Sequence, residues 1–344
     1  MTRRRRLATV RRVNFLAGVD EAGLGPILGP LVVAGVAMAG PAGADPWRAL
    51  RGQVSRRKHV KGKVRVADSK KVNQGPQGRQ RLEETALVFW TARHGSTPAT
   101  LREWLEQLGA DLPQLSRCPW YEDLDLTLPL AADPGLVELR GAVVARALGR
   151  HGIELLDLAV RPVDVEEWNG LIADTDNKSR AHFHAYAEVL GRILDRVPAA
   201  PPAAGGEGDS EGDAPARRQL VADRCGGRMH YEHDLRRLRP RAEVEIVLET
   251  PAVSSYLLRE QGSEITVTFA ERGEERAFPT ALASCFAKYL RELMVEVLNR
   301  WFCARIPGLK PTAGYYVDGH RFLDDVLPQV EALALPRERL VRVR

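Results

Sequence analysis

Most of the chain consists of two kinds of pattern, short apolar runs and longer stretches in which apolar residues have helical spacing. A short apolar run bounded by glycine, proline or charged residues predicts a buried strand. A stretch in which apolar residues recur every three or four positions predicts a helix that packs one face against a core. The predicted strands are 15–19, 31–37, 155–160, 219–222, 244–248 and 264–269, and the predicted helices are 79–90, 137–148, 180–197 and 279–302.

The first two predicted strands are joined by a turn rich in glycine and proline, which predicts a hairpin. Residues 92–150 form an insertion that follows neither pattern over most of its length, and we leave its structure unassigned. Residues 197–218 contain no aromatic side chain and consist largely of Pro, Ala, Gly and acids, so we expect a disordered loop. Because a predicted strand follows directly, we place this loop within one domain spanning 14–344, preceded by a basic tail over 1–13.

The positive charge is concentrated in two segments. The net charge is +5 at pH 7, but residues 1–12 hold six arginines, which leaves 44 of the 50 Lys and Arg against 45 Asp and Glu in the rest of the chain. Residues 51–71 carry nine Lys or Arg and one acid, Asp68. Such a density attracts a polyanion such as a phosphate backbone. A solvated surface hairpin is the alternative interpretation of the same residues.

Composition and cysteine usage narrow the class of protein. With 44% hydrophobic and 28% charged residues, the chain has an ordinary globular composition. Four cysteines without a CxxC pair favour a reducing compartment over a disulfide framework, so we expect a cytoplasmic protein. Cys225, His230 and His233 lack a paired fourth ligand, which argues against zinc.

A membrane or export segment is not expected either. Residues 24–44 carry no charge, but they contain three prolines and five glycines, which make a spanning helix unsuitable there. Asp20 and Glu21 interrupt the apolar region that a secretory signal would need directly after the arginines.

Asp20 and Glu21 are the first candidates for chemistry. They end the first predicted strand and precede a glycine turn, where an unpaired buried carboxylate is costly and a divalent cation would offset that cost. An acidic turn in water is the alternative. A dinucleotide-binding fingerprint is excluded, because Leu28 stands where its third glycine would fall.

Residues 18–30, GVDEAGLGPILGP, resemble the opening motif of the type 2 ribonucleases H, the ribonuclease HII and HIII group. They match the pattern GVDEAGRGPxxGP except at Leu24, where the family has a basic residue. Three further segments agree in order. They are 67–72, which resembles the family's DSKK segment, 283–292, which resembles its ASxxAKxxRD helix, and Gly314-Tyr315 with His320, which resembles its GY…H segment. The resemblance leaves 92–175 uncovered.

The resemblance implies a ribonuclease H-like α/β fold, a mixed sheet flanked by helices. It also implies an active site of four carboxylates that holds two divalent ions, Mg²⁺ or Mn²⁺. Asp20 and Glu21 match the first two carboxylates, Asp223 is the expected third, and Glu292 stands where the family has aspartate. An ordinary helical ion pair with Lys288, four residues earlier, is the alternative role for Glu292.

The resemblance assigns substrate contacts as well. Backbone groups of Gly23, Leu24 and Gly25 would contact the 2′-hydroxyl that distinguishes RNA from DNA. Ser69 and Lys70 would contact phosphate beside the metals. Tyr315 would stack on the sugar at an RNA-to-DNA junction, or else would be a packed aromatic with a bonded hydroxyl.

The implied activity is endonucleolytic hydrolysis of the RNA strand of RNA·DNA hybrids by a two-metal mechanism, leaving 5′-phosphate and 3′-hydroxyl ends. A tyrosine at position 315 extends this to single ribonucleotides embedded in DNA. The expected partners are such duplexes, with no membrane, and the expected state is a monomer. Leu24 and Glu292 favour an alternative, a nucleic-acid-binding protein of the same fold without catalysis. Cleavage of another nucleic acid stays open, because a fold does not fix a substrate.

Overall fold

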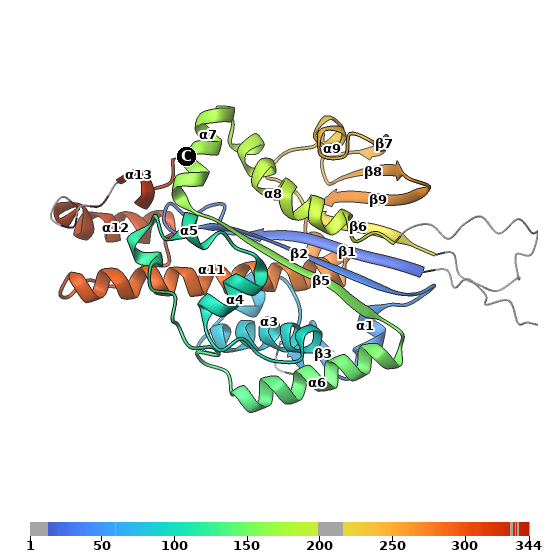
Figure 1. Ribbon diagram of the computed structural model, residues 1–344, viewed down its shortest axis with the longest axis horizontal. Helices are drawn as coiled ribbons and strands as arrows, with labels where there is room; N and C mark the ends of the chain where they lie inside the picture. Colours follow the sequence, from blue (N-terminus) through green and yellow to red (C-terminus); the bar gives the residue numbers. More distant parts are fainter. Residues whose placement is uncertain are drawn as a thin grey trace, which may run out of the picture.

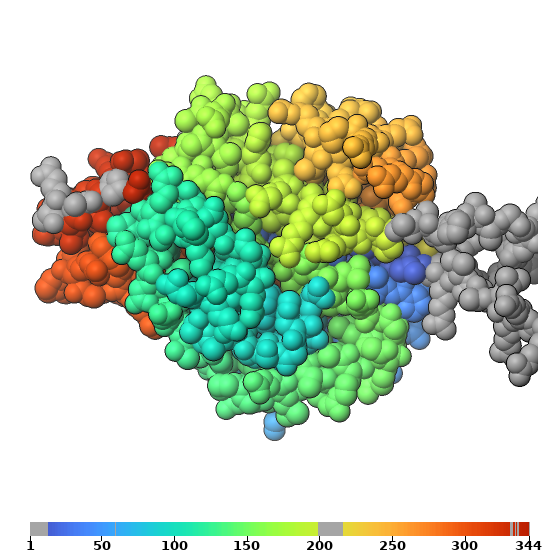
Figure 2. All heavy atoms as spheres, viewed as in Figure 1, coloured from blue at the N-terminus to red at the C-terminus, as the bar shows by residue number. Residues whose placement is uncertain are grey.

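The computed structural model describes residues 13–58, 60–198 and 216–330, together with 333, 335 and 337–343 (Figure 1). Most of the basic tail expected over 1–13 and of the loop expected over 197–218 lies outside the described residues, and the described ends of the two segments, Val13 and Arg218, already belong to strands. Residues 92–150, which we expected to form an insertion, are described throughout, and Figure 2 shows them in teal to green, covering one side of the molecule.

Seven strands form one mixed sheet in the order β5-β2-β1-β6-β9-β8-β7. Strand β1 pairs antiparallel with β2, which confirms the predicted hairpin, and parallel with β6, which in turn pairs parallel with β9. The bounds of the strands are β1 Val13–Ala22, β2 Leu31–Pro41, β5 Glu154–Val163, β6 Arg218–Asp223, β7 Glu243–Glu249, β8 Val253–Glu260 and β9 Ser263–Ala270. In the basic segment, β3 (Val54–Ser55) and β4 (Val64–Arg65) form a separate parallel pair.

Helices cover both faces of the sheet, as Figure 1 shows. Helix α11 packs on one face with α3 beside it, and α8 packs on the other. The bounds of the helices are α1 Pro46–Ala49, α2 Ser69–Val72, α3 Gly78–His94, α4 Leu101–Leu108, α5 Leu112–Leu115, α6 Pro134–Arg150, α7 Val165–Thr175, α8 Lys178–Leu194, α9 Glu232–Leu238, α10 Gly273–Arg276, α11 Phe278–Arg305, α12 Tyr316–Val326 and α13 Arg337–Leu340. Short 3₁₀ turns span Pro119–Tyr121 and Leu327–Gln329. A mixed sheet flanked by helices is the fold class that the resemblance implied.

The apolar pattern locates six of the seven described strands of the main sheet and the four longest described helices, and it misses β8 and the shorter helices. The helix predicted over 180–197 is α8, which ends at Leu194. The preceding helix α7 is not predicted, although Asp164 caps it by accepting a hydrogen bond from the backbone N–H of Glu167 at 2.8 Å. Aspartate is a favoured residue at this capping position. The first strand extends past its apolar run to Ala22, so the two acids belong to the strand.

Glycine lets the two flanking helices lie directly against the central strands. A Cβ atom on Gly18 of β1 would lie 2.1 Å from the backbone nitrogen of Thr280 in α11. On the opposite face, a Cβ atom on Gly35 of β2 would lie 2.6 Å from Ile193 in α8. Neither distance is physically tolerable. The close approach of both helices therefore depends on glycine at these two positions.

A buried carboxylate links the segment 92–150 to the core. The Glu83 side chain of α3 is fully buried and accepts hydrogen bonds from the backbone N–H groups of Leu130, Ala131 and Ala132 at 2.6, 2.7 and 2.7 Å. The hydroxyl of Tyr289 in α11 donates to the same carboxylate at 2.6 Å. One side chain thus fixes a loop of the insertion against α3 and α11.

Replacing this carboxylate should destabilise the protein strongly. Glu83→Ala leaves three backbone N–H groups and the buried Tyr289 hydroxyl without their acceptor, so we expect a loss of about 3 kcal/mol or more in the free energy of unfolding. Urea unfolding of the purified variant measures it. Glu106 is exposed and supplies the control. Its variant Glu106→Ala should stay within about 0.5 kcal/mol of the wild type. A loss below about 1 kcal/mol for Glu83→Ala would contradict the anchoring role.

Candidate active site

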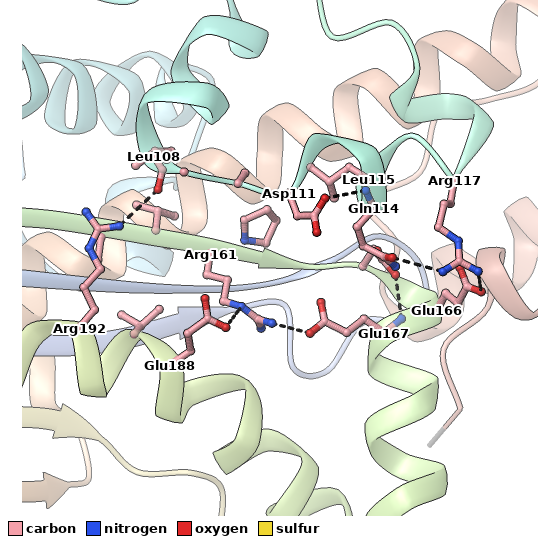
Figure 3. A pocket seen from close by; sticks show the side chains of 17 residues that line it. Leu108, Asp111, Gln114, Leu115, Arg117, Arg161, Glu166, Glu167, Glu188 and Arg192 are labelled. Atoms are coloured by element: carbon pink, nitrogen blue, oxygen red, sulfur yellow. Dashed lines mark hydrogen bonds and ion pairs between the residues drawn. The ribbon is translucent and has the colours of Figure 1, made fainter. Parts of the chain in front are cut away.

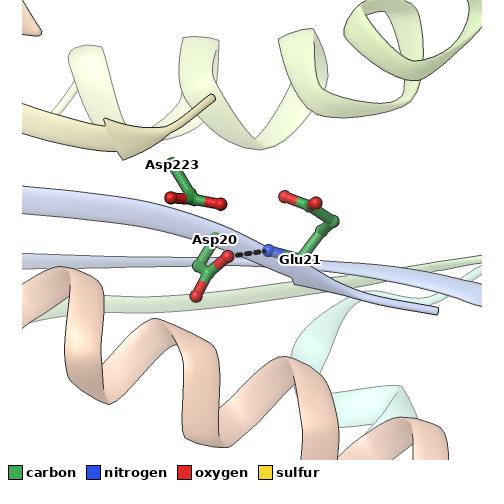
Figure 4. Close-up of side chains that lie close together, drawn as sticks. All are labelled: Asp20, Glu21 and Asp223. Atoms are coloured by element: carbon green, nitrogen blue, oxygen red, sulfur yellow. Dashed lines mark hydrogen bonds between the residues drawn. The ribbon is translucent and has the colours of Figure 1, made fainter. Parts of the chain in front are cut away.

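Three carboxylates meet where β1 and β6 end side by side. The two strands run parallel, with Val19 paired to Ala222, so Asp20 and Asp223 follow as neighbours. Ligand oxygens of Asp20, Glu21 and Asp223 all lie within 4.8 Å of one another (Figure 4). The structure therefore brings together three of the four carboxylates that the sequence indicated.

The alternation of a β-strand places the two adjacent acids on opposite sides of the sheet. Phe15, Ala17 and Val19 belong to the core under α8, so Glu21 faces α8 and Asp20 faces α11. Figure 4 shows the Asp20 carboxylate turned toward α11 and the Glu21 carboxylate turned away from it. The cluster thus straddles the end of the sheet, and each helix supplies contacts to a different carboxylate.

On the α11 side, serine hydroxyls join Asp20 to the DSKK segment. The hydroxyl of Ser284 donates to the Ser69 hydroxyl at 3.0 Å and accepts from the Ser69 N–H at 3.3 Å, and the Ser284 side chain lies close enough to Asp20 to lower the pKa of that carboxyl. Ser69 opens helix α2 and is buried, whereas Lys70 is exposed beside it. Three of the four motifs, those of Asp20, Ser69 and Ser284, therefore meet at this point.

On the α8 side, two side chains one helical turn apart face the strand ends. Nε2 of His182 lies 3.6 Å from Oε1 of Glu21. The hydroxyl of Tyr186 donates to the carbonyl of Val19 at 2.6 Å and lies 3.4 Å from the carbonyl of Asp223. Neither aromatic residue belongs to a motif, and their only sequence signal is their place on the apolar face of a predicted helix.

The electrostatics of the cluster favour binding of a cation. Burial raises the pKa of Asp20 well above its ordinary value, and the charges of Asp223 and Glu21 raise it further. Burial and then the charge of Glu21 raise the pKa of Asp223 to about 7, against a hydrogen bond from the Gly273 N–H. No lysine or arginine of the described residues forms an ion pair with these three carboxylates. One buried and two half-buried acids without a lysine or arginine partner suit a hard divalent ion such as Mg²⁺ or Mn²⁺.

The carboxylates open into a hollow of about 380 Å³ that a polyanion could enter. Its lining combines acids with cations of the basic segment and of the turn before α10: Asp20, Glu21, Asp68, Ser69, Lys70, Lys71, Asp223, Arg272, Glu274, Glu275 and Ser284. Glu274 is an acidic residue of this hollow that no motif indicated.

A second hollow, of about 530 Å³, lies beside the edge strand β5 (Figure 3). Its charged side chains are paired with each other: Arg161 lies 2.5 Å from Glu167 and 2.7 Å from Glu188, and Arg117 lies 2.8 Å from Glu166. Because these charges neutralise one another, they offer little for chemistry.

Glu292 is not among the described residues whose ligand oxygens converge within 4.8 Å. Its Oε1 lies 2.6 Å from Nζ of Lys288 and 3.8 Å from Arg291. It follows Ser284, which contacts Asp20, by eight residues of α11. Eight helical residues correspond to a rise of about 12 Å. The structure thus shows the helical ion pair that the sequence left open as the alternative role.

Two buried arginines donate hydrogen bonds to the glycine turn, which we define as residues 23–30 between β1 and β2. Nη2 of Arg291 donates to the carbonyls of Leu28 and Ala313 at 3.3 and 3.1 Å. Nη1 of Arg342 donates to the carbonyls of Gly23 and Pro26. The sequence motif lacks a basic residue at position 24, and the structure places a guanidinium against the same turn from a distant segment.

The Gly314-Tyr315 segment of the last motif lies against the glycine turn of the first motif. The carbonyl of Gly314 accepts hydrogen bonds from the N–H groups of Ile27 and Leu28 at 2.9 and 3.3 Å. Tyr315 is 45% exposed, and Arg291 lies 5.5 Å and Lys288 5.7 Å from the centre of its ring. The ring therefore lies at the surface beside the glycine turn and is not packed in the core.

No protein-family model and no curated protein sequence matches the chain. Among solved structures, the chain is similar to the ribonuclease HII of Archaeoglobus fulgidus in its complex with PCNA, with 16% identity, a TM-score of 0.40 and coverage of 96% of this chain and 94% of that chain. It is also similar to the ribonuclease H2 of Pyrococcus horikoshii, with 14% identity, a TM-score of 0.37 and coverage of 95% and 92%. The Bst-RNase HIII solved with Mn²⁺ gives 13% identity and a TM-score of 0.39, with coverage of 96% of this chain and 66% of that chain.

These neighbours are named as ribonucleases HII, H2 and HIII, and the likeness concerns the fold alone. The chain's own side chains and their arrangement must therefore support any assignment of function. None of the described helices is long and apolar enough to cross a bilayer.

The raised pKa values predict an unusual dependence of stability on pH in the absence of metal. Asp223 in the folded protein binds a proton up to about pH 7, whereas in the unfolded chain it loses that proton at about pH 4. The folded state thus holds more protons between these values, so this contribution to stability is present below about pH 4 and is lost as the pH rises to about 7.

Urea unfolding in the presence of a chelator measures this contribution at several pH values. We expect the unfolding free energy of the wild type to fall from pH 5 to pH 8 relative to that of Asp223→Asn, which cannot ionise. Parallel pH profiles for the two proteins would contradict the raised pKa.

Proposed function

We propose that the protein is an endonuclease that depends on divalent metal ions and hydrolyses the RNA strand of RNA·DNA hybrids. The observation that carries the proposal is the convergence of Asp20, Glu21 and Asp223 within 4.8 Å, without a lysine or arginine partner among the described residues. These three carboxylates would hold Mg²⁺ or Mn²⁺. The bound ions would supply an activated water and stabilisation of the departing 3′ oxygen.

The residues around the carboxylates fit a phosphodiester substrate. Lys70 is exposed at the hollow and Ser69 is fixed there by Ser284, so both can contact a phosphate next to the carboxylates. Further along the basic segment, Arg57, Lys58 and Lys61 are exposed. We propose that the backbone of the duplex lies along this segment and enters the hollow past Lys70.

Recognition of RNA is assigned to the glycine turn and to Tyr315. Gly23 has a φ of +96°, and Gly25 is exposed with open space where a Cβ would lie. A positive φ suits glycine, and the lack of a side chain allows a close approach to the backbone. Backbone groups of Gly23, Leu24 and Gly25 can therefore approach a 2′-hydroxyl closely. The exposed ring of Tyr315 beside this turn can stack on a sugar, which would extend cleavage to a single ribonucleotide in DNA.

The nuclease assay offers the purified protein two labelled duplexes, an RNA·DNA hybrid and a DNA duplex with one ribonucleotide, each with Mg²⁺ or Mn²⁺. We expect cleavage that leaves 5′-phosphate ends and that falls at least about 100-fold in Asp20→Asn, because an essential ligand is lost. The exposed Asp125→Asn is the matched control and should cleave like the wild type. Binding of either duplex without cleavage under both metals would overturn the proposal and favour a nucleic-acid-binding protein of the same fold.

The assignment of Glu292 as a fourth ligand stays a prediction, and its ion pair with Lys288 at 2.6 Å specifically favours a structural role. If Glu292 stays paired with Lys288 and does not bind the metal, Glu292→Gln should lower the cleavage rate by less than about tenfold, far less than Asp20→Asn does. An equal loss in the two variants would instead mean that the ion pair opens and that Glu292 acts at the metal site. The same cleavage assay distinguishes the two results.

A further inference from the structure

His182 is a buried polar side chain without a hydrogen-bond partner at its Nε2 atom. The residue lies on α8 and is 1% exposed. Among the described residues nothing forms a hydrogen bond with Nε2, and the Glu21 carboxylate approaches it to 3.6 Å. Leaving such a group unsatisfied costs about 1 to 3 kcal/mol, so its presence in a folded protein calls for a reason.

The environment of the imidazole keeps it facing Glu21. Its ring packs edge-on against Tyr186, with ring centres 5.8 Å apart and an angle of 84° between the planes. The Tyr186 hydroxyl is bonded to the carbonyl of Val19, which fixes this part of α8 to the end of β1. The imidazole therefore lies between its own helix and the strand that carries Glu21.

Glu21 also carries a polar atom without a hydrogen-bond partner. Its Oε2 atom is also buried and has no hydrogen-bond partner among the described residues. The unsatisfied Nε2 of His182 faces the other oxygen of this carboxylate, Oε1, across 3.6 Å, slightly longer than a hydrogen bond, and a small rotation of the glutamate side chain would close the gap.

We propose that His182 is a positioning residue for Glu21, an inference that rests on the proposed function. The Nε2–H group donates to Oε1 of Glu21, and this bond leaves Oε2 free to bind a divalent cation. Carboxylate ligands are commonly oriented by such outer hydrogen bonds, and losing one typically weakens metal binding by about 10- to 100-fold. His182 does not join the group of ligand atoms within 4.8 Å, so it acts through Glu21 and does not bind the metal itself.

Helix α8 provides a matched control in His184. This residue has the same side chain on the same helix two positions later, and it is exposed. A change at His184 therefore tests the effect of removing a histidine from α8 without touching Glu21.

The experiment measures Mn²⁺ binding to the metal-free protein by isothermal titration calorimetry, together with urea unfolding of each variant in chelator. We expect His182→Leu to bind Mn²⁺ about 10- to 100-fold more weakly than the wild type. His182→Gln keeps an N–H donor and should recover most of the affinity, and His184→Leu should bind like the wild type. Because leucine removes an unsatisfied polar group, His182→Leu should be at least as stable as the wild type without metal.

A double-mutant cycle with Glu21→Gln separates positioning from packing. If His182 acts through the Glu21 carboxylate, His182→Leu should change the Mn²⁺ affinity much less in the Glu21→Gln background than in the wild type. Equal effects in both backgrounds, or wild-type affinity in His182→Leu, would overturn the inference. If His182→Leu does not fold, His182→Gln still decides, because loss of affinity there would also contradict it.

The Mn²⁺-binding results that contradict the proposed function differ from those that contradict the positioning role of His182. If the wild type binds no Mn²⁺, or if Asp20→Asn binds it as tightly as the wild type, the metal site itself is contradicted. Mn²⁺ binding that depends on Asp20 but is indifferent to His182 would remove only the positioning role.

Discussion

The rest of the site depends on one constraint, the mutual repulsion and partial desolvation of three carboxylates at the neighbouring ends of β1 and β6, of which Asp20 is buried and Glu21 and Asp223 are half-buried. Asp20, Glu21 and Asp223 are brought within 4.8 Å by the parallel register of the two strands, and the described residues supply no lysine or arginine to pair with them. Only a proton or a metal cation can offset that cost. The raised pKa values of Asp20 and Asp223 show the first solution, and the proposed metal site is the second.

Helix α11 and the glycine turn assemble the remaining parts around this charge. Gly18 admits α11 against β1, which brings Ser284 to Asp20 and, through it, Ser69 of the basic segment. Further along the same helix, Arg291 reaches the carbonyl of Leu28 in the glycine turn. Segments far apart in the sequence thus meet along one long helix, which packs on a face of the sheet and contacts the hollow through Ser284 and the glycine turn through Arg291.

The sequence predicts the apolar centres of the strands beside the site well and the neighbours of the carboxylates poorly. Asp20, Glu21 and Asp223 follow apolar strands, so their convergence can be expected once the strands are placed in one sheet. The place of Glu292 cannot be read from a motif, because eight residues of helix separate it from the contact at Ser284 and Lys288 competes for its carboxylate. His182 gives no sequence signal, since a histidine on the apolar face of a helix looks like any core residue.

Diffraction from crystals soaked in Mn²⁺, recorded for the anomalous signal of manganese, tests the central claim most directly. The account predicts a peak between Asp20, Glu21 and Asp223, at about 2.0 to 2.6 Å from their carboxylate oxygens, the range for hard divalent ions. The same peak should be absent from crystals of Asp20→Asn. Wild-type crystals without a peak at this place, or with manganese only elsewhere, would contradict the claim that these carboxylates form a metal site.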